Sequence, residues 1–172
     1  MSSASDSDVT SLLARAHQLL ETVCDPEIPV LTIADLGILR ELHWNAAESR
    51  LDVVITPTYS GCPAMSMIEV NIRAALQEGG FERVQVNTVL SPAWTTDWLS
   101  EQGREKLQRF GIAAPAEASL DKKALLGETR ALQCPFCGSS NTQMISQFSS
   151  TACKALFRCL DCLEPFDYFK CH

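Results

Sequence analysis

The sequence predicts a small α/β domain followed by a much smaller metal-binding module. Apolar residues recur at three- and four-residue steps in some segments and alternate in others, in the order helix, strand, strand, helix, strand. The 42 residues beyond Arg130 hold two C-x-x-C pairs and half of the aromatic residues of the chain. We therefore place a domain at residues 1–112, a linker rich in Ala, Pro and Gly at 113–130, and the module at 131–172.

The first three elements are a helix and a β-hairpin separated by a loop. Apolar positions over residues 9–23 follow helical spacing, and the polar residues before them can cap the start of the helix. The two prolines in "DPEIPV", residues 25–30, end this helix because proline lacks an amide donor and restricts the residue before it. Residues 36–44 and 50–58 then alternate like strands, and "NAAES" supplies the turn between them.

A second helix, a third strand and a further helix follow. Pro63 suits a first helical turn, and apolar residues mark one face of a helix over 64–76 until Gly79 ends it. Residues 81–90 have the pattern of a third strand, and a capped helix is expected from about Thr96. This order of elements is typical of a small α/β sandwich.

Composition and charge exclude several classes of protein. Hydrophobic content of 46% with 20% charged residues is that of a globular chain with a packed core. The net charge of -7 arises entirely from residues 1–130, which hold 18 acidic and 11 basic side chains, whereas the remainder holds three of each. Because nucleic-acid binders need a basic stripe that neutralises phosphates, we expect protein partners and no nucleic acid.

Cysteine use depends on the cellular compartment. The N-terminus lacks the basic and apolar regions of a secretory signal, and no apolar run is long enough for a membrane span, so we expect a cytoplasmic protein without membrane contact. In a reducing compartment the eight cysteines are expected to bind metal rather than form a disulfide framework.

The C-terminal cysteines predict a zinc ribbon with four cysteine ligands. Cys134 and Cys137 form one C-x-x-C pair, and Cys159 and Cys162 form another after 21 intervening residues. Each two-residue gap allows both sulfurs of a turn to reach one ion, and 42 residues are too few for an ordinary core without such a site. Structural zinc is the favoured interpretation, and a rubredoxin-like iron site, a transferable cluster and redox thiols are its alternatives. Three further candidate ligands lie nearby: Cys153, Cys171 and His172.

Cys62 lies outside this cluster and needs a separate explanation. It precedes Pro63 at the start of a predicted helix, where free amides and the helix dipole favour a thiolate. Asp25 and Glu27 lie in another loop that could fold beside it. The simpler alternative is that Cys62 only caps the helix or fills space. Because no histidine is placed as a general base, metal or cluster handling suits this sulfur better than thiol hydrolysis.

Two sets of motifs carry a resemblance to known families. "DPEIPVLTIADLGILR", followed by a strand and a loop ending in "GCP", resembles the domain shared by SufT and the cytosolic iron-sulfur targeting factors. With "TPTYSGCPA", "SPAWTTDWLSEQGREKL", "CPFCGS" and "STACKALFRCLDCLEPFDYFKC", nearly the whole chain resembles the PaaD family, also called PaaJ, the accessory subunits encoded with phenylacetyl-CoA epoxidase. The loop "TPTYSGCP" is longer than the compact Thr-Thr-x-x-Cys-Pro form of the wider assembly family.

The resemblance implies an α/β iron-sulfur assembly domain fused to a zinc ribbon. It implies a pocket formed by Cys62, Asp25, Glu27, Asp35 and Thr56, and a role in phenylacetate catabolism without epoxidation by this chain itself. The implied role is assistance in assembling an iron-sulfur or diiron centre in a partner subunit, either the reductase or the diiron oxygenase.

Two hypotheses follow for the chain. In the first, Cys62 is a functional thiolate that transiently binds iron or a cluster, and the ribbon holds structural zinc. Because one thiolate cannot complete a cluster's ligand set, this hypothesis requires a partner protein, the iron-sulfur assembly machinery or a homodimer. In the second, the chain is a purely structural subunit that holds the oxygenase components together, and Cys62 is dispensable. Catalysis by the chain itself is not expected in either, because no base is placed for it.

Overall fold

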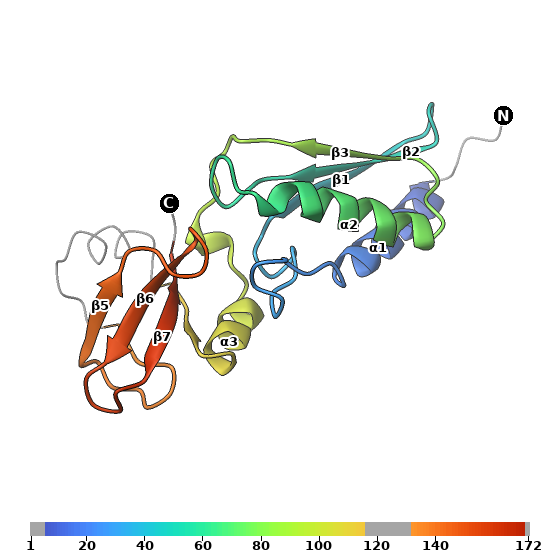
Figure 1. Ribbon diagram of the computed structural model, residues 1–172. Coiled ribbons are helices and arrows are strands. Elements are labelled where there is room, and N and C mark those ends of the chain that lie inside the picture. The colour runs from blue at the N-terminus through green and yellow to red at the C-terminus, as the bar shows by residue number, and fades with distance from the viewer. Residues whose placement is uncertain (1–5, 116–131, 171–172) are drawn as a thin grey trace. The chain divides into compact units, whose positions relative to one another are not determined.

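The computed structural model describes residues 6–115 and 132–170, and it is a mixed α/β fold as predicted (Figure 1). The chain forms two compact units, Met1–Trp94 and Thr95–His172. This division differs from the boundary predicted at residue 112, which stays a prediction. Most of the predicted linker lies outside the described residues.

The first unit is a three-stranded sheet with two helices on one face. Its elements are α1 (Asp6–Leu20), β1 (Leu39–Asn45), β2 (Arg50–Ile55), α2 (Ala64–Glu78) and β3 (Val84–Thr88). The strand order is β1-β2-β3, in which β1 and β2 form the predicted antiparallel hairpin and β3 pairs in parallel with β2. A parallel pair needs a crossover connection, and α2 supplies it.

The core of the first unit follows from alternation in β2 and from helical spacing in α2. Leu51, Val53 and Ile55 are buried, and the residues between them are only partly buried. On α2 the buried positions are Ala64, Ile68, Ile72 and Leu76, whose spacing of four residues places them on one face toward the sheet. As predicted, the helix ends at a glycine, Gly79.

The segment between α1 and β1 is irregular, as its two prolines predict, but much of it is buried. Backbone bonds from Asp25 N to the Leu31 carbonyl and from Ile33 N to the Val23 carbonyl, both 2.9 Å, hold it in place. Ile28, Leu31, Ile33 and Leu36 are among its core residues. This loop therefore has a defined backbone conformation from which polar side chains can project.

The second unit begins with two short helical segments where one helix was expected. A 3-10 turn, η1 (Thr96–Trp98), is followed by extended Leu99 and then by α3 (Glu101–Arg109). The prediction of one capped helix from about Thr96 is wrong because Ser100 is an N-cap of its own, with its side chain accepting from Gly103 N at 2.9 Å.

A four-stranded sheet completes the second unit. Its strands are β4 (Ile112–Ala113), β5 (Thr142–Ser146), β6 (Lys154–Cys159) and β7 (Pro165–Phe169), in the order β4-β7-β6-β5. β4 pairs in parallel with β7, so Ile112 and Ala113 belong to the ribbon sheet and not to the first unit or a linker. This pairing ties residues 112–113 to the second unit.

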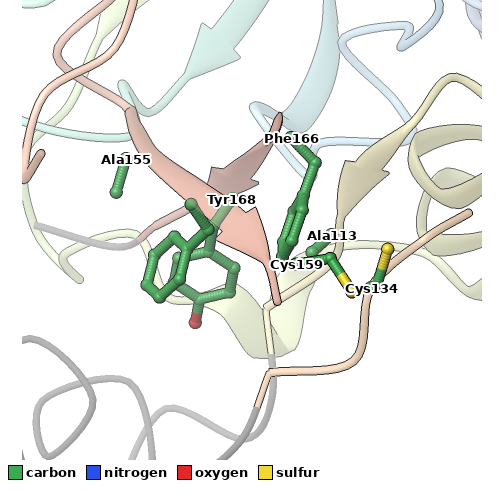
Figure 2. Close-up of a cluster of buried hydrophobic side chains, with 7 residues drawn as sticks. Ala113, Cys134, Ala155, Cys159, Phe166 and Tyr168 are labelled. Carbon is green, nitrogen blue, oxygen red and sulfur yellow. The ribbon is translucent and has the colours of Figure 1, made fainter. Parts of the chain in front are cut away.

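The core of the second unit is small and rich in aromatic and sulfur-containing side chains (Figure 2). Phe157 stacks on Phe166 at a centroid distance of 5.9 Å and meets Tyr168 edge to face at 5.8 Å. Figure 2 shows the sulfurs of Cys134 and Cys159 beside this layer. The metal-ligand candidates are thus an extension of the core.

Candidate metal centre and thiol pocket

The four predicted ribbon ligands converge at one point. Their sulfur atoms, from Cys134, Cys137, Cys159 and Cys162, all lie within 4.8 Å of one another. The Cys134 and Cys162 sulfurs are 3.7 Å apart, and those of Cys137 and Cys159 are 3.6 Å apart. Sulfurs placed tetrahedrally about 2.3 Å from a zinc ion are separated by about 3.8 Å. The four thiols therefore fit a tetrahedral zinc ion.

Hydrogen bonds beyond the sulfurs hold the two cysteine turns in place. Gly138, with φ of 74°, donates its amide to the Cys134 carbonyl at 2.9 Å and closes the first turn. Asp161 in the second turn accepts hydrogen bonds from the Ser139 hydroxyl and, at 2.8 Å, from the Asn141 amide, which lower the pKa of its carboxyl. Asp161 therefore links the two turns, a role that the sequence analysis missed.

The electrostatics of the four thiols favour a bound cation. The Cys162 amide is the main cause that lowers the pKa of Cys159 to about 7. The pKa of Cys162 rises to about 12 because burial and the other three cysteines outweigh the hydrogen bond from the Glu164 amide. One thiolate thus forms readily, while further negative charge at the cluster is opposed. A divalent ion removes that opposition by neutralising the thiolates.

Cys153 is not part of this cluster. Its thiol is buried and lies 3.1 Å from the Thr151 hydroxyl, and its carbonyl accepts the Lys170 amide at 3.0 Å. These contacts give Cys153 a place in the packing next to β6. The other two extra candidates, Cys171 and His172, lie outside the described residues.

In the first unit, Cys62 lies in the loop that connects β2 to α2. It directly precedes Pro63, the N-cap of α2, and its carbonyl accepts the Met65 amide at 3.3 Å. The side chain is partly buried. The loop leaves the sheet at Thr56, whose amide donates to the Ile38 carbonyl at 2.9 Å. Cys62 is therefore positioned at the carboxyl end of β2 and the amino end of α2.

The surroundings of Cys62 raise the pKa of its thiol on balance, although the start of α2 lowers it. Burial is the main cause that raises the pKa of this thiol, and the carboxylates of Glu27 and Asp25 raise it further. Hydrogen bonds with the Ala64 amide and the Tyr59 side chain lower the pKa but do not outweigh those causes. The Ala64 amide at the start of α2 thus lowers the pKa, as expected of a helix start, while burial and the two carboxylates make the net shift upward.

The same interactions bring two of the predicted pocket residues to Cys62. Asp25 and Glu27 lie in the irregular segment before β1, yet their charges act on a thiol more than 30 residues later in the chain. Tyr59 also acts on Cys62, and the sequence analysis missed it although it lies only three residues away. The pocket of Cys62, Asp25, Glu27, Asp35 and Thr56 stays a prediction, which the effect of Asp25 and Glu27 on the pKa of Cys62 supports.

The carboxylates of the pocket also organise their own loop. Asp25 is buried, and its Oδ1 accepts the amides of Glu27 and Ile28, both at 2.8 Å. Asp35 is buried as well, and its Oδ2 accepts the Thr32 amide at 3.0 Å and the Thr32 hydroxyl at 2.9 Å. Both are turn-forming contacts typical of aspartate.

Thr56 is the unusual member of the predicted pocket. It is 1% exposed, and its hydroxyl has no hydrogen-bond partner among the described residues. A buried hydroxyl without a partner costs free energy, so its retention at the base of the Cys62 loop calls for an explanation.

Only the four ribbon cysteines, among the residues that the structure describes, gather three or more metal-ligating atoms within 4.8 Å.

Comparison with known proteins identifies both parts of the chain. Residues 14–88 match the family described as "Iron-sulfur cluster assembly protein", and residues 118–170 match "PaaD zinc beta ribbon domain". A protein of Escherichia coli (strain K12), named as a subunit of a putative 1,2-phenylacetyl-CoA epoxidase, is 52% identical over 155 residues, which are 89% of each chain. The chain belongs to the PaaD family. The motifs quoted from its sequence thus indicated the correct family.

The fold of the first part is also known from a solved structure. A domain of unknown function, DUF59, from Bacillus anthracis superposes on this PaaD-family chain with a TM-score of 0.55 and 23% identity, covering 60% of this chain and 97% of that one. This likeness confirms the fold of the assembly-type domain.

None of the described helices is long and apolar enough to cross a membrane.

Proposed function

We propose that this PaaD-family chain is an accessory maturation protein of a phenylacetyl-CoA epoxidase complex. In this proposal Cys62 receives iron or an iron-sulfur cluster as cargo and passes it to another subunit of the complex. The ribbon holds structural zinc in the second unit. The observation that carries the proposal is the action of two carboxylates, Asp25 and Glu27, on the partly buried Cys62 thiol.

The raised pKa of Cys62 suits a site that is filled only transiently. Without cargo the thiol keeps its proton, because burial and two nearby carboxylates oppose a further negative charge. An arriving cation is attracted by the same carboxylates, and the proton leaves the Cys62 sulfur as a metal-sulfur bond forms. Loading is thus coupled to proton release, and an empty site stays unreactive.

The ligand set of the pocket favours transfer over storage. Cys62 supplies one soft sulfur ligand, and it does not gather with two other ligating groups among the described residues, so this chain does not complete the usual set of cluster ligands. The remaining ligands must come from a donor or a recipient protein, namely the iron-sulfur assembly machinery and the client subunit. Incomplete coordination keeps the cargo exchangeable, which a carrier needs.

The experiment measures maturation of the client in the presence of cysteine variants. The other epoxidase subunits are produced anaerobically with wild-type chain, with Cys62→Ser, with Cys24→Ser or without the chain, and their iron and acid-labile sulfide are measured. Cys24→Ser is the matched control because Cys24 is exposed and adjacent to Asp25 in the same loop.

We expect Cys62→Ser to reduce client metal to the level found without the chain, and Cys24→Ser to behave as wild type. Zinc content should be equal in all three versions of the chain. Full client maturation with Cys62→Ser would overturn the proposal and favour the purely structural subunit.

A further inference from the structure

The large exposed hydrophobic side chains of the first unit are confined to one part of its described surface. They are Met67, Val70 and Leu90, which are 52%, 60% and 63% exposed. Single exposed apolar residues are ordinary on protein surfaces, so their number alone means little. Their common location relative to Cys62 is what makes them informative.

Met67 and Val70 belong to an apolar stripe on the outer face of α2. The stripe is formed by Pro63, Met67, Val70 and Ala74, all exposed and spaced by four, three and four residues. It lies opposite the buried positions of the same helix. A helix face toward solvent normally carries charged residues, and this stripe carries none.

Two charged residues of α2 that flank the stripe are engaged with the sheet. Glu69 accepts the Thr88 hydroxyl at 3.1 Å, and Arg73 donates to the Val84 carbonyl at 2.7 Å. Both contacts direct these side chains toward β3. The outer face of the first three turns of α2 is thus apolar apart from Ser66.

The stripe begins beside the thiol pocket. Pro63 directly follows Cys62, and β3 runs parallel to β2, so its carboxyl end lies at the same end of the unit as the Cys62 loop (Figure 1). Leu90 follows that end of β3 by two residues, and the bond between Thr88 and Glu69 ties it to α2. The stripe therefore starts next to Cys62, and Leu90 lies at the same end of the unit.

Charge decides what can cover this surface. Residues 1–94 contain 12 acidic side chains, five arginines and no lysine, which gives 5 − 12 = −7. Two copies packed through this unit would bring two strongly acidic surfaces together, which disfavours self-association. A partner segment with an apolar centre and basic residues around it complements both the stripe and the net negative charge of this unit.

We infer that the stripe, together with Leu90, is the docking surface for an apolar, lysine- or arginine-flanked segment of the client subunit. This inference rests on the proposed carrier function of Cys62. Docking there brings the client's own ligands to the thiol and removes water from the surface around it. The apolar stripe supplies the contact area, and the net negative charge of the unit speeds association with a basic segment.

The test measures binding of each purified epoxidase subunit to the zinc-loaded full chain by titration calorimetry. The variant Met67→Glu/Val70→Glu places two carboxylates in the stripe. Ala46→Glu/Ala47→Glu is the matched control, because these exposed residues lie in the hairpin turn before β2, at the far end of the strand from Cys62. Thermal unfolding checks that both variants are folded, and the uncharged pair Met67→Ser/Val70→Ser provides a milder change.

We expect the stripe variant to weaken the Kd for one subunit by about tenfold or more, in the range of an interface hot spot. The control should bind as wild type, and wild-type binding should weaken as salt is raised. Equal binding by the stripe variant would overturn this inference while leaving cargo transfer through Cys62 intact. Wild-type chain that binds no subunit would overturn both proposals. A wild-type dimer that the stripe substitutions dissociate would show a second copy as the occupant and refute the charge argument.

Discussion

Replacing Thr56 by valine should stabilise the protein and impair its function. Valine has nearly the shape of threonine but lacks the hydroxyl, which in Thr56 is buried and has no hydrogen-bond partner among the described residues. Thr56 directly follows the last residue of β2, where a β-branched residue is favourable. The substitution therefore removes a desolvated polar group without creating a cavity.

The size of the effect follows from the cost of an unsatisfied buried group, about 1–3 kcal/mol. In a unit of this size, about 1 kcal/mol corresponds to roughly 4–8 °C in the unfolding midpoint. We therefore expect Thr56→Val to raise the midpoint of the first unit by at least about 4 °C. If the hydroxyl is retained for cargo handling at Cys62, the same variant should lower client maturation.

The assay combines differential scanning calorimetry with the client metal measurement. Thr96→Val is the matched control, since Thr96 is also fully buried with an unpartnered hydroxyl among the described residues but belongs to the second unit. It should stabilise the second unit and leave client maturation unchanged. An unchanged or lower midpoint for Thr56→Val would refute the argument that its hydroxyl is unsatisfied. A stabilised variant with full maturation activity would refute its role in cargo handling.

Two further predictions concern zinc and the reactivity of Cys62. Chelation of zinc, or Cys134→Ser, should unfold the second unit and spare the first. Structural zinc contributes about 10–16 kcal/mol, which is as much as the whole stability of a typical domain. Amide hydrogen exchange measures the protection of each unit separately, and a protected ribbon in the metal-free protein would contradict the prediction. The carboxylate of Glu27 raises the pKa of Cys62, so Glu27→Gln should lower that pKa. The variant should therefore be alkylated faster by iodoacetamide at about pH 8, because the thiolate is the reactive form. An unchanged or slower rate of alkylation would count against contact between the two loops.

The sequence was sufficient for the elements whose patterns are local. Helical spacing predicted α1 and α2, alternation predicted the hairpin of β1 and β2, and the two C-x-x-C pairs predicted the four sulfurs that converge. In each case the residues that matter are a few positions apart, or are cysteines whose chemistry requires a common ion.

Tertiary structure decided the features that depend on residues distant in sequence. The pairing of β4 with β7 assigned residues 112–113 to the ribbon, and a two-residue strand has no periodicity that could reveal this. The direction of the net pKa shift at Cys62 depends on burial and on carboxylates from a separate loop, whereas the sequence analysis derived a favoured thiolate from the helix start. The unpartnered hydroxyl of Thr56, among the residues described, is likewise a property of its surroundings. Local hydrogen bonding and side-chain spacing depend on residues that are close in the sequence. Desolvation and charge proximity depend on residues that come together only when the chain folds.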